Sequence, residues 1–145
     1  MFTAACTDPL TGLLNRAGWE IGTADLLSRS RETSTAVTVV VLDIDGLKQI
    51  NDTYGHQAGD RRIVEYAHRW RRAVPRQAVL ARLGGDEFAV CIAGEKPEVV
   101  EQFRRDVERQ TPGVSYGAAT QTSIEADVAA LYAQADAARS HGRCP

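Results

Sequence analysis

Residues 81–90 read ARLGGDEFAV, in which two short apolar runs flank a pair of glycines and a pair of acids. Glycines between β-prone segments are typical of a tight hairpin turn, so this stretch predicts two strands joined at Gly84 and Gly85. Polar residues are common in solvated turns, and Asp86 and Glu87 taken alone are explained by such a turn. Their meaning depends on what the rest of the chain brings beside them.

The segments on either side of this hairpin predict an α+β protein. Ala36–Leu42 (AVTVVVL) is a continuous β-branched run, typical of a strand buried on both faces. Together with the helices, the strands follow the order β-α-β-β-α-β, a ferredoxin-like core with an antiparallel central sheet flanked by helices. The predicted elements are a helix to about Arg31, a strand at Ala36–Leu42, a short helix at Gly46–Asp52, a longer helix from an Asp60 N-cap to Pro75, strands at Val79–Leu83 and Phe88–Ile92, a helix at Pro97–Gln110, a strand at Val114–Ala119 and a helix at Asp127–Ser140.

This topology predicts where the acids of the hairpin lie. The crossover from the first strand to the second is parallel and right-handed, and the third strand runs back between them. The C-terminal end of the first strand and the hairpin tip then share one end of the sheet. We therefore expect Asp43 to lie beside Asp86 and Glu87, although it is distant from them in the sequence.

Carboxylates gathered at one end of a sheet repel one another unless a cation neutralises them. Hard oxygen ligands without histidine or cysteine nearby suit Mg²⁺ or Mn²⁺. Such ions can activate a hydroxyl and stabilise a leaving oxygen, so the chemistry indicated is phosphoryl or nucleotidyl transfer. From spacing alone, this chemistry and a plain solvated turn both remain open. Asp45, a further acid near this end, is interpreted as structural or as a support for the metal ligands.

The bulk composition narrows the class of protein. The chain has 145 residues and a net charge of −2, which argues against a general nucleic-acid binder. No apolar run is long enough to span a bilayer, and the first residues lack the pattern of a signal peptide. Cys6, Cys91 and Cys144 are odd in number and in no metal-binding spacing, so we expect reduced thiols in a cytoplasmic protein.

Several long motifs resemble the GGDEF domain of diguanylate cyclases. They are DPLTGLLNR at 8–16, LDIDGLKQINDTYGHQAGD at 42–60, LGGDEF at 83–88 and VSYGAA at 114–119, and they occur in the family's order. The resemblance implies that two GTP molecules condense to cyclic di-GMP with release of two pyrophosphates, aided by Mg²⁺ or Mn²⁺. Each domain would hold one GTP and face a second copy, so a homodimer, even a transient one, is implied. It also implies one GGDEF domain over residues 1–145, attached to a sensory or dimerising region in a longer protein.

The resemblance assigns the reacting end of the nucleotide to five residues. Asp43, the backbone carbonyl of Ile44, Asp86 and Glu87 would ligate metal, and Glu87 would also assist deprotonation of the ribose 3′-hydroxyl. Lys48 would contact phosphate near a helix N-terminus, which itself favours anions. Lys48, Asp86 and Glu87 are thus the implied catalytic residues, although Lys48 has a simpler interpretation as a solvated helix lysine.

The remaining implied roles concern recognition of the substrate. Asn51 and Asp60 would read guanine, because a carboxylate accepts from the N1–H and N2–H₂ groups that adenine lacks. Both have simpler interpretations, Asn51 as a helix end and Asp60 as only an N-cap. Gly84 and Gly85 would let the backbone approach the nucleotide without a Cβ. The other implied substrate contacts are Gly46, Leu47, Arg139 and Arg143.

The C-terminal helix departs from the family pattern. Family members read Ala-Asp-x-Ala-Leu-Tyr-x-Ala-Lys, whereas Ala135–Ala138 are followed at once by Arg139. About one helical turn is missing, which shortens the reach of this segment by about 5–6 Å. Arg139 replaces the phosphate-binding lysine in charge but not in geometry, and the missing Leu-Tyr pair is predicted to remove apolar packing.

Three functions are therefore compatible with the sequence. The intact acids, lysine and guanine pair favour an active diguanylate cyclase. The shortened helix favours a GTP-binding regulatory module that is weakly active or inactive. A different nucleotide cyclase or nucleotidyl transferase with the same palm-type core is a third reading, and Asn51 and Asp60 argue against it.

Overall fold

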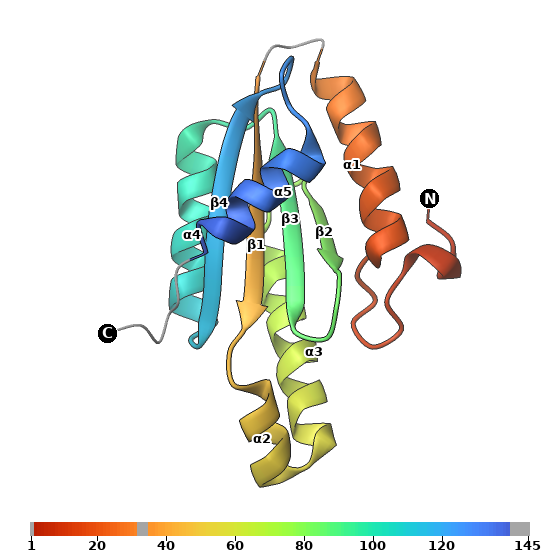
Figure 1. The fold of residues 1–145 in the computed structure, drawn as a ribbon, viewed down its shortest axis with the longest axis vertical. Helices are drawn as coiled ribbons and strands as arrows, with labels where there is room; N and C mark the ends of the chain where they lie inside the picture. The colour runs from red at the N-terminus through yellow and green to blue at the C-terminus, as the bar shows by residue number, and fades with distance from the viewer. Residues whose placement is uncertain (1, 32–34, 140–145) are drawn as a thin grey trace.

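The computed structural model describes residues 2–31 and 35–139. Figure 1 shows one sheet with helices packed on both of its faces. In chain order the elements are a short 3-10 turn η1 (Ala4–Cys6), α1 (Arg16–Ser30), β1 (Ala36–Ile44), α2 (Leu47–Tyr54), α3 (His56–Ala73), β2 (Val79–Arg82), β3 (Glu87–Ala93), α4 (Pro97–Gln110), β4 (Val114–Thr122) and α5 (Val128–Ala137).

The sheet has four strands in the order β2-β3-β1-β4, and every neighbouring pair is antiparallel. β3 therefore runs back between β1 and β2, as the sequence predicts. In Figure 1 the C-terminal end of β1, the β2–β3 hairpin tip and the start of β4 lie at the lower end, beyond which α2 projects. The predicted α+β, ferredoxin-like class is confirmed.

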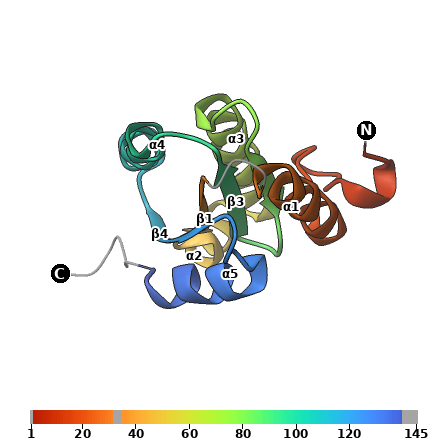
Figure 2. The ribbon, with the colours of Figure 1, turned by 90° about the horizontal axis from the view of Figure 1, so that it is seen from above.

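Two separate cores cover the two faces of the sheet. Seen from above, α3 and α4 lie on one face and α1 and α5 on the other (Figure 2). The α3/α4 face holds large side chains, of which Trp70, Phe88 and Phe103 are almost completely buried. The α1/α5 face combines Trp19 and leucines of the helices with small residues of the sheet such as Ala89. Small side chains allow helices to approach the sheet closely.

One predicted helix boundary is wrong. Asp60 is not an N-cap, because α3 begins at His56 and Asp60 lies within its second turn. The glycine before it, Gly59, lies inside the helix where α2 packs against α3. A Cβ on Gly59 would come within 2.8 Å of Asn51 Cγ, so glycine is what permits this contact.

The last helix is anchored by apolar residues that precede the predicted shortening. Leu131 is fully buried and Tyr132 packs beside it, and both lie N-terminal to the Ala135-Asp136 pair. Asp127 caps the helix by accepting hydrogen bonds from Ala129 N and Ala130 N at 3.0 and 3.3 Å. α5 ends at Ala137, three residues before the predicted end at Ser140.

Candidate functional site

The predicted acids meet at the end of the sheet. Asp43 in β1 lies opposite Glu87 in β3, and the Ile44 amide donates to the Asp86 carbonyl at 3.0 Å. Asp43 and Glu87 continue the strand positions of Val41 and Ala89, which belong to the α1/α5 core. Their side chains therefore stand on the α1/α5 face, since alternate strand residues share a face.

Burial and mutual repulsion perturb these acids. Burial and the neighbouring Asp86 raise the pKa of Asp43 to about 6, against the opposing pull of Arg139. Burial and the nearby Asp136 raise the pKa of Glu87, while Arg139 and Arg16 act in the opposite direction. A site that disfavours charged carboxylates in this way gains free energy from any cation that enters it.

One cation is already present at Asp43. The Arg139 guanidinium donates to Asp43 Oδ2 at 2.6 Å and lies 3.5 Å from Asp136 Oδ1. Asp43 Oδ1 is nevertheless buried without a hydrogen-bond partner, and so is Arg139 Nε. Within residues 2–31 and 35–139, no three His, Cys, Asp or Glu side chains are arranged to hold a metal ion together.

Asp45 supports the strands instead of joining the acids. Its carboxylate accepts from the Ser115 hydroxyl at 2.9 and 2.8 Å, and its amide donates to the Gly113 carbonyl at 2.8 Å. These bonds tie the end of β1 to the start of β4. The structural interpretation of Asp45 is therefore the better one.

The segment after β1 presents the residues predicted for phosphate. Gly46 adopts a positive φ of 74° and caps α2, so that the helix begins at Leu47 directly after the strand. Lys48 lies exposed in the first turn of α2. The amides of a helix N-terminus and an exposed lysine both favour an anion at this place.

The residues predicted to read guanine are brought together by α2 and α3. Asn51 packs on Gly59, the residue before Asp60, and its Oδ1 atom is buried without a donor. A cavity of about 600 Å³ opens beside Asp60, with Leu10 and Val64 among its walls. The pair thus has an unsatisfied acceptor and an adjoining space.

The hairpin tip is held by a residue that sequence reasoning missed. Arg82 donates to the Gly85 carbonyl at 3.2 and 2.9 Å and pairs with Asp8 Oδ1 at 3.1 Å. The Arg82 and Asp8 side chains are 16% and 15% exposed. Arg82 directly precedes the signature and Asp8 opens the DPLTGLLNR motif, but nothing in their types or spacing reveals that they meet.

The glycines of the turn are not required by the chain itself. Neither Gly84 nor Gly85 has a positive φ. A Cβ on Gly84 would come no closer than 4.0 Å to Glu87 Oε1, and a Cβ on Gly85 would meet nothing within 4 Å. Both glycines line a cavity of about 370 Å³, so the tip has open space beside it. Arg143, also predicted to bind substrate, lies outside the described residues.

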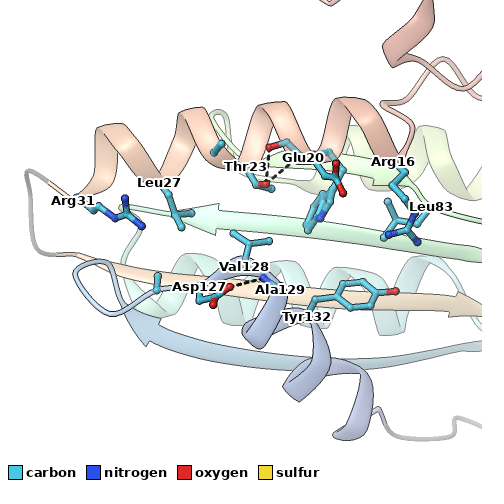
Figure 3. Close-up of a pocket in the computed structure, with 13 residues that line it drawn as sticks. Arg16, Glu20, Thr23, Leu27, Arg31, Leu83, Asp127, Val128, Ala129 and Tyr132 are labelled. Carbon is cyan, nitrogen blue, oxygen red and sulfur yellow. Dashed lines mark hydrogen bonds between the residues drawn. The ribbon is translucent and has the colours of Figure 1, made fainter.

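A groove on the same face was not predicted. It has a volume of about 610 Å³ and runs between α1 and α5 (Figure 3). Leu27 of α1 faces Val128 of α5 across it, Arg31 stands at one end, and Arg16 and Leu83 stand at the end nearer the hairpin. It adjoins the acids but is lined by none of the predicted site residues.

Comparison with known proteins shows the family of the chain. The chain matches the family described as "Diguanylate cyclase, GGDEF domain" over residues 5–142 and belongs to it. It is 41% identical over 92 residues to diguanylate cyclase DgcN of Escherichia coli K12, covering 63% of this chain and 22% of that protein. It is 37% identical over 91 residues to probable diguanylate cyclase DgcC of the same strain, covering 63% of this chain and 24% of that protein.

The fold comparison gives the same family. The GGDEF domain of DgcB from Caulobacter crescentus, solved in complex with c-di-GMP, superposes with a TM-score of 0.84 at 29% identity. The match covers 94% of this chain and 89% of that one. This chain thus spans less than a quarter of DgcN and DgcC. No helix among its described residues is long and apolar enough to cross a membrane.

Proposed function

We propose that this chain is a diguanylate cyclase domain that joins two GTP molecules into cyclic di-GMP at the interface of two face-to-face copies. The observation that carries the proposal is the meeting of Asp43 with the Asp86–Glu87 hairpin tip, beside the first turn of α2. Acids, helix N-terminus and lysine are the parts that nucleotidyl transfer needs at one place.

The donor set fits a divalent cation. Asp43 Oδ1 is a buried acceptor without a donor, and Asp86 lies close enough to raise the pKa of Asp43. Asp43, Asp86 and the Ile44 carbonyl would hold Mg²⁺ or Mn²⁺, with Glu87 next to them, because such ions prefer oxygen ligands and need few protein carboxylates. When bound, the cation would neutralise phosphate charge and make the attacking hydroxyl more acidic.

The chain's own residues would orient the nucleotide around these acids. Asn51 and Asp60 would accept from the guanine edge, and Leu10 would pack against the base. Lys48 would hold a phosphate at the start of α2. The open turn at Gly84-Gly85 would leave room for the ribose, and Glu87, whose pKa is raised, would accept the proton of the 3′-hydroxyl.

The test is direct synthesis of the product. Concentrated protein is incubated with GTP and Mg²⁺, and cyclic di-GMP is measured by chromatography. Asp86→Asn and Glu87→Gln are expected to abolish product. Asp25→Asn is the matched control, because this exposed carboxylate lies on α1 away from the acids and pairs only with Arg29 among the described residues. Its product yield should equal that of the wild type.

A second function is favoured by one observation. Because Arg139 already neutralises Asp43, the site could bind GTP without turning it over. Retained GTP binding with no product at any protein concentration would establish this regulatory module and reject the cyclase. Equal affinities for GTP and ATP would reject the guanine assignment of Asn51 and Asp60.

A further inference from the structure

The C-terminal end of α5 delivers a single cation to the acids. Leu131 and Ala135 are fully buried on the α1/α5 face, and Arg139 follows at the same four-residue spacing. α5 ends at Ala137, and a turn closed by the Arg139 amide on the Asp136 carbonyl at 3.2 Å carries Arg139 onto β4 beside Ala135. The Arg139 guanidinium then donates to Asp43 Oδ2 at 2.6 Å.

A close contact between α5 and β4 fixes this position. A Cβ on Gly117 would lie 2.6 Å from Arg139 N and 2.7 Å from Arg139 Cα, and would also strike the Ala135 carbonyl. Glycine in β4 therefore lets the end of the helix rest on the sheet itself. The predicted loss of one helical turn bears on this position, because a cation one turn further along would stand about 5–6 Å beyond Asp43.

The Arg139–Asp43 ion pair is partly exposed and its hydrogen bonding is incomplete. Its side chains are 25% and 23% exposed, so water and ions reach it. Arg139 Nε is buried without an acceptor and Asp43 Oδ1 without a donor, so neither group is fully satisfied by the other. Asp136 Oδ1 lies 3.5 Å from the same guanidinium and offers it a second carboxylate.

We propose that Arg139 is the internal counter-ion of the metal site, which pairs with Asp43 and opposes the binding of a divalent cation beside it. This inference rests on the proposed function, since it takes Asp43 as a metal ligand. Arg139 pairs with Oδ2 whereas Oδ1 is left for a cation, so the guanidinium does not block the metal but weakens its attraction to the same carboxylate. Asp136 and the phosphates of an incoming nucleotide offer the guanidinium other anions when the metal binds.

The test measures metal binding without nucleotide. Mn²⁺ is titrated into the full chain, and the free ion is followed by electron paramagnetic resonance. Arg139→Gln should raise Mn²⁺ affinity about tenfold or more, because removing a cation within hydrogen-bonding distance strengthens the field of the acids. Arg29→Gln removes the same formal charge from an exposed pair on α1 and should change affinity less than about twofold.

Two further variants tie the gain to Asp43. In Asp43→Asn/Arg139→Gln the gain should disappear. Arg139→Lys should fall between the wild type and Arg139→Gln, because a lysine keeps the charge but lacks the fork that holds the carboxylate. If Arg139→Gln fails to fold, Arg139→Lys still tests the proposal, because its Mn²⁺ affinity should exceed that of the wild type.

Three results would overturn the proposal. They are equal affinity in Arg139→Gln and Arg29→Gln, weaker binding in Arg139→Gln, and no Mn²⁺ binding in any variant. Because no GTP is present, a chain that makes no cyclic di-GMP still gives a clear answer. Conversely, if the protein makes cyclic di-GMP but its Mn²⁺ affinity does not change in Arg139→Gln, the counter-ion role of Arg139 is rejected and the cyclase proposal stands.

Discussion

The two faces of the sheet differ in the side chains that cover them. The α3/α4 face is filled by Trp70, Phe88 and Phe103. The ring centroids of Trp70 and Phe88 lie 4.9 Å apart in an edge-to-face arrangement. The α1/α5 face combines Trp19 and leucines of the helices with alanines and Gly117, and at its lower end it changes from apolar to acidic at Asp43 and Glu87. Mutations should therefore separate a face that stabilises the fold from a face that positions charge.

The largest effect is expected on the aromatic face. Phe88→Ala should lower the free energy of unfolding by about 3–5 kcal/mol, because a fully buried ring leaves a cavity beside Trp70. Denaturant unfolding measures this loss. Phe88→Leu, which keeps most of the volume, should cost less than about 1.5 kcal/mol. If Phe88→Ala were no worse than Phe88→Leu, the division between the faces would be incorrect.

The next effect concerns the ion pair behind the hairpin. Arg82→Ala should cost about 2–3 kcal/mol at neutral pH, because it leaves a mostly buried Asp8 carboxylate unpaired. Arg29→Ala, which breaks an exposed pair, should cost less than about 1 kcal/mol. Similar losses in both variants would show that Asp8 gains nothing from its burial.

The Asp8 pair should also respond to acid. Burial alone would raise the pKa of Asp8, but hydrogen bonds from Thr11 and the Arg82 guanidinium hold it below its usual 3.8. A depressed pKa means that this stabilisation is present above pH 3.8 and is lost as the pH falls through the lower, folded-state value. The difference in unfolding free energy between wild type and Arg82→Ala should therefore shrink as the pH falls below 3.8. A difference that stays constant with pH would contradict this role of the Asp8–Arg82 pair.

A smaller effect tests the close approach of α5. Gly117→Ala should cost about 1–3 kcal/mol, because its Cβ meets the helix backbone, which cannot give way like a side chain. Thermal unfolding measures the change. Gly85→Ala is the matched control, since its Cβ meets open space, and it should stay within about 0.5 kcal/mol of the wild type. Equal stability of the two variants would mean that α5 does not rest on β4.

The smallest effect on stability is expected at the start of α2. Lys48→Ala should change unfolding by less than about 0.5 kcal/mol, because this side chain is exposed. GTP affinity should nevertheless fall about tenfold through loss of a charged phosphate contact. Lys96→Ala removes an exposed lysine at the opposite end of the sheet and should leave GTP affinity unchanged. A loss in both variants would indicate only a general charge effect.

The sequence predicts the strands and their order because their signals are local. A β-branched run, a glycine turn and helical spacing each lie within a few residues, and topology then brings Asp43 to Glu87. The N-cap prediction at Asp60 is wrong because the turn between α2 and α3 lies at Gly55, which has a positive φ of 93°, and α3 begins directly after it. The pairs Asp8–Arg82 and Asp43–Arg139 were missed because each depends on where two distant side chains end in space.

The alternation Leu42-Asp43-Ile44 has a consequence for folding fidelity. Leu42 and Ile44 are buried in the aromatic core, and Leu42 pairs with Phe88 one step from the Asp43–Glu87 pair. A slip of β1 by one residue would drive Asp43 among the rings and expose its apolar neighbours. Burial of Leu42 and Ile44 in the aromatic core therefore fixes the register of β1. The same register keeps the Asp43 and Glu87 side chains on the α1/α5 face.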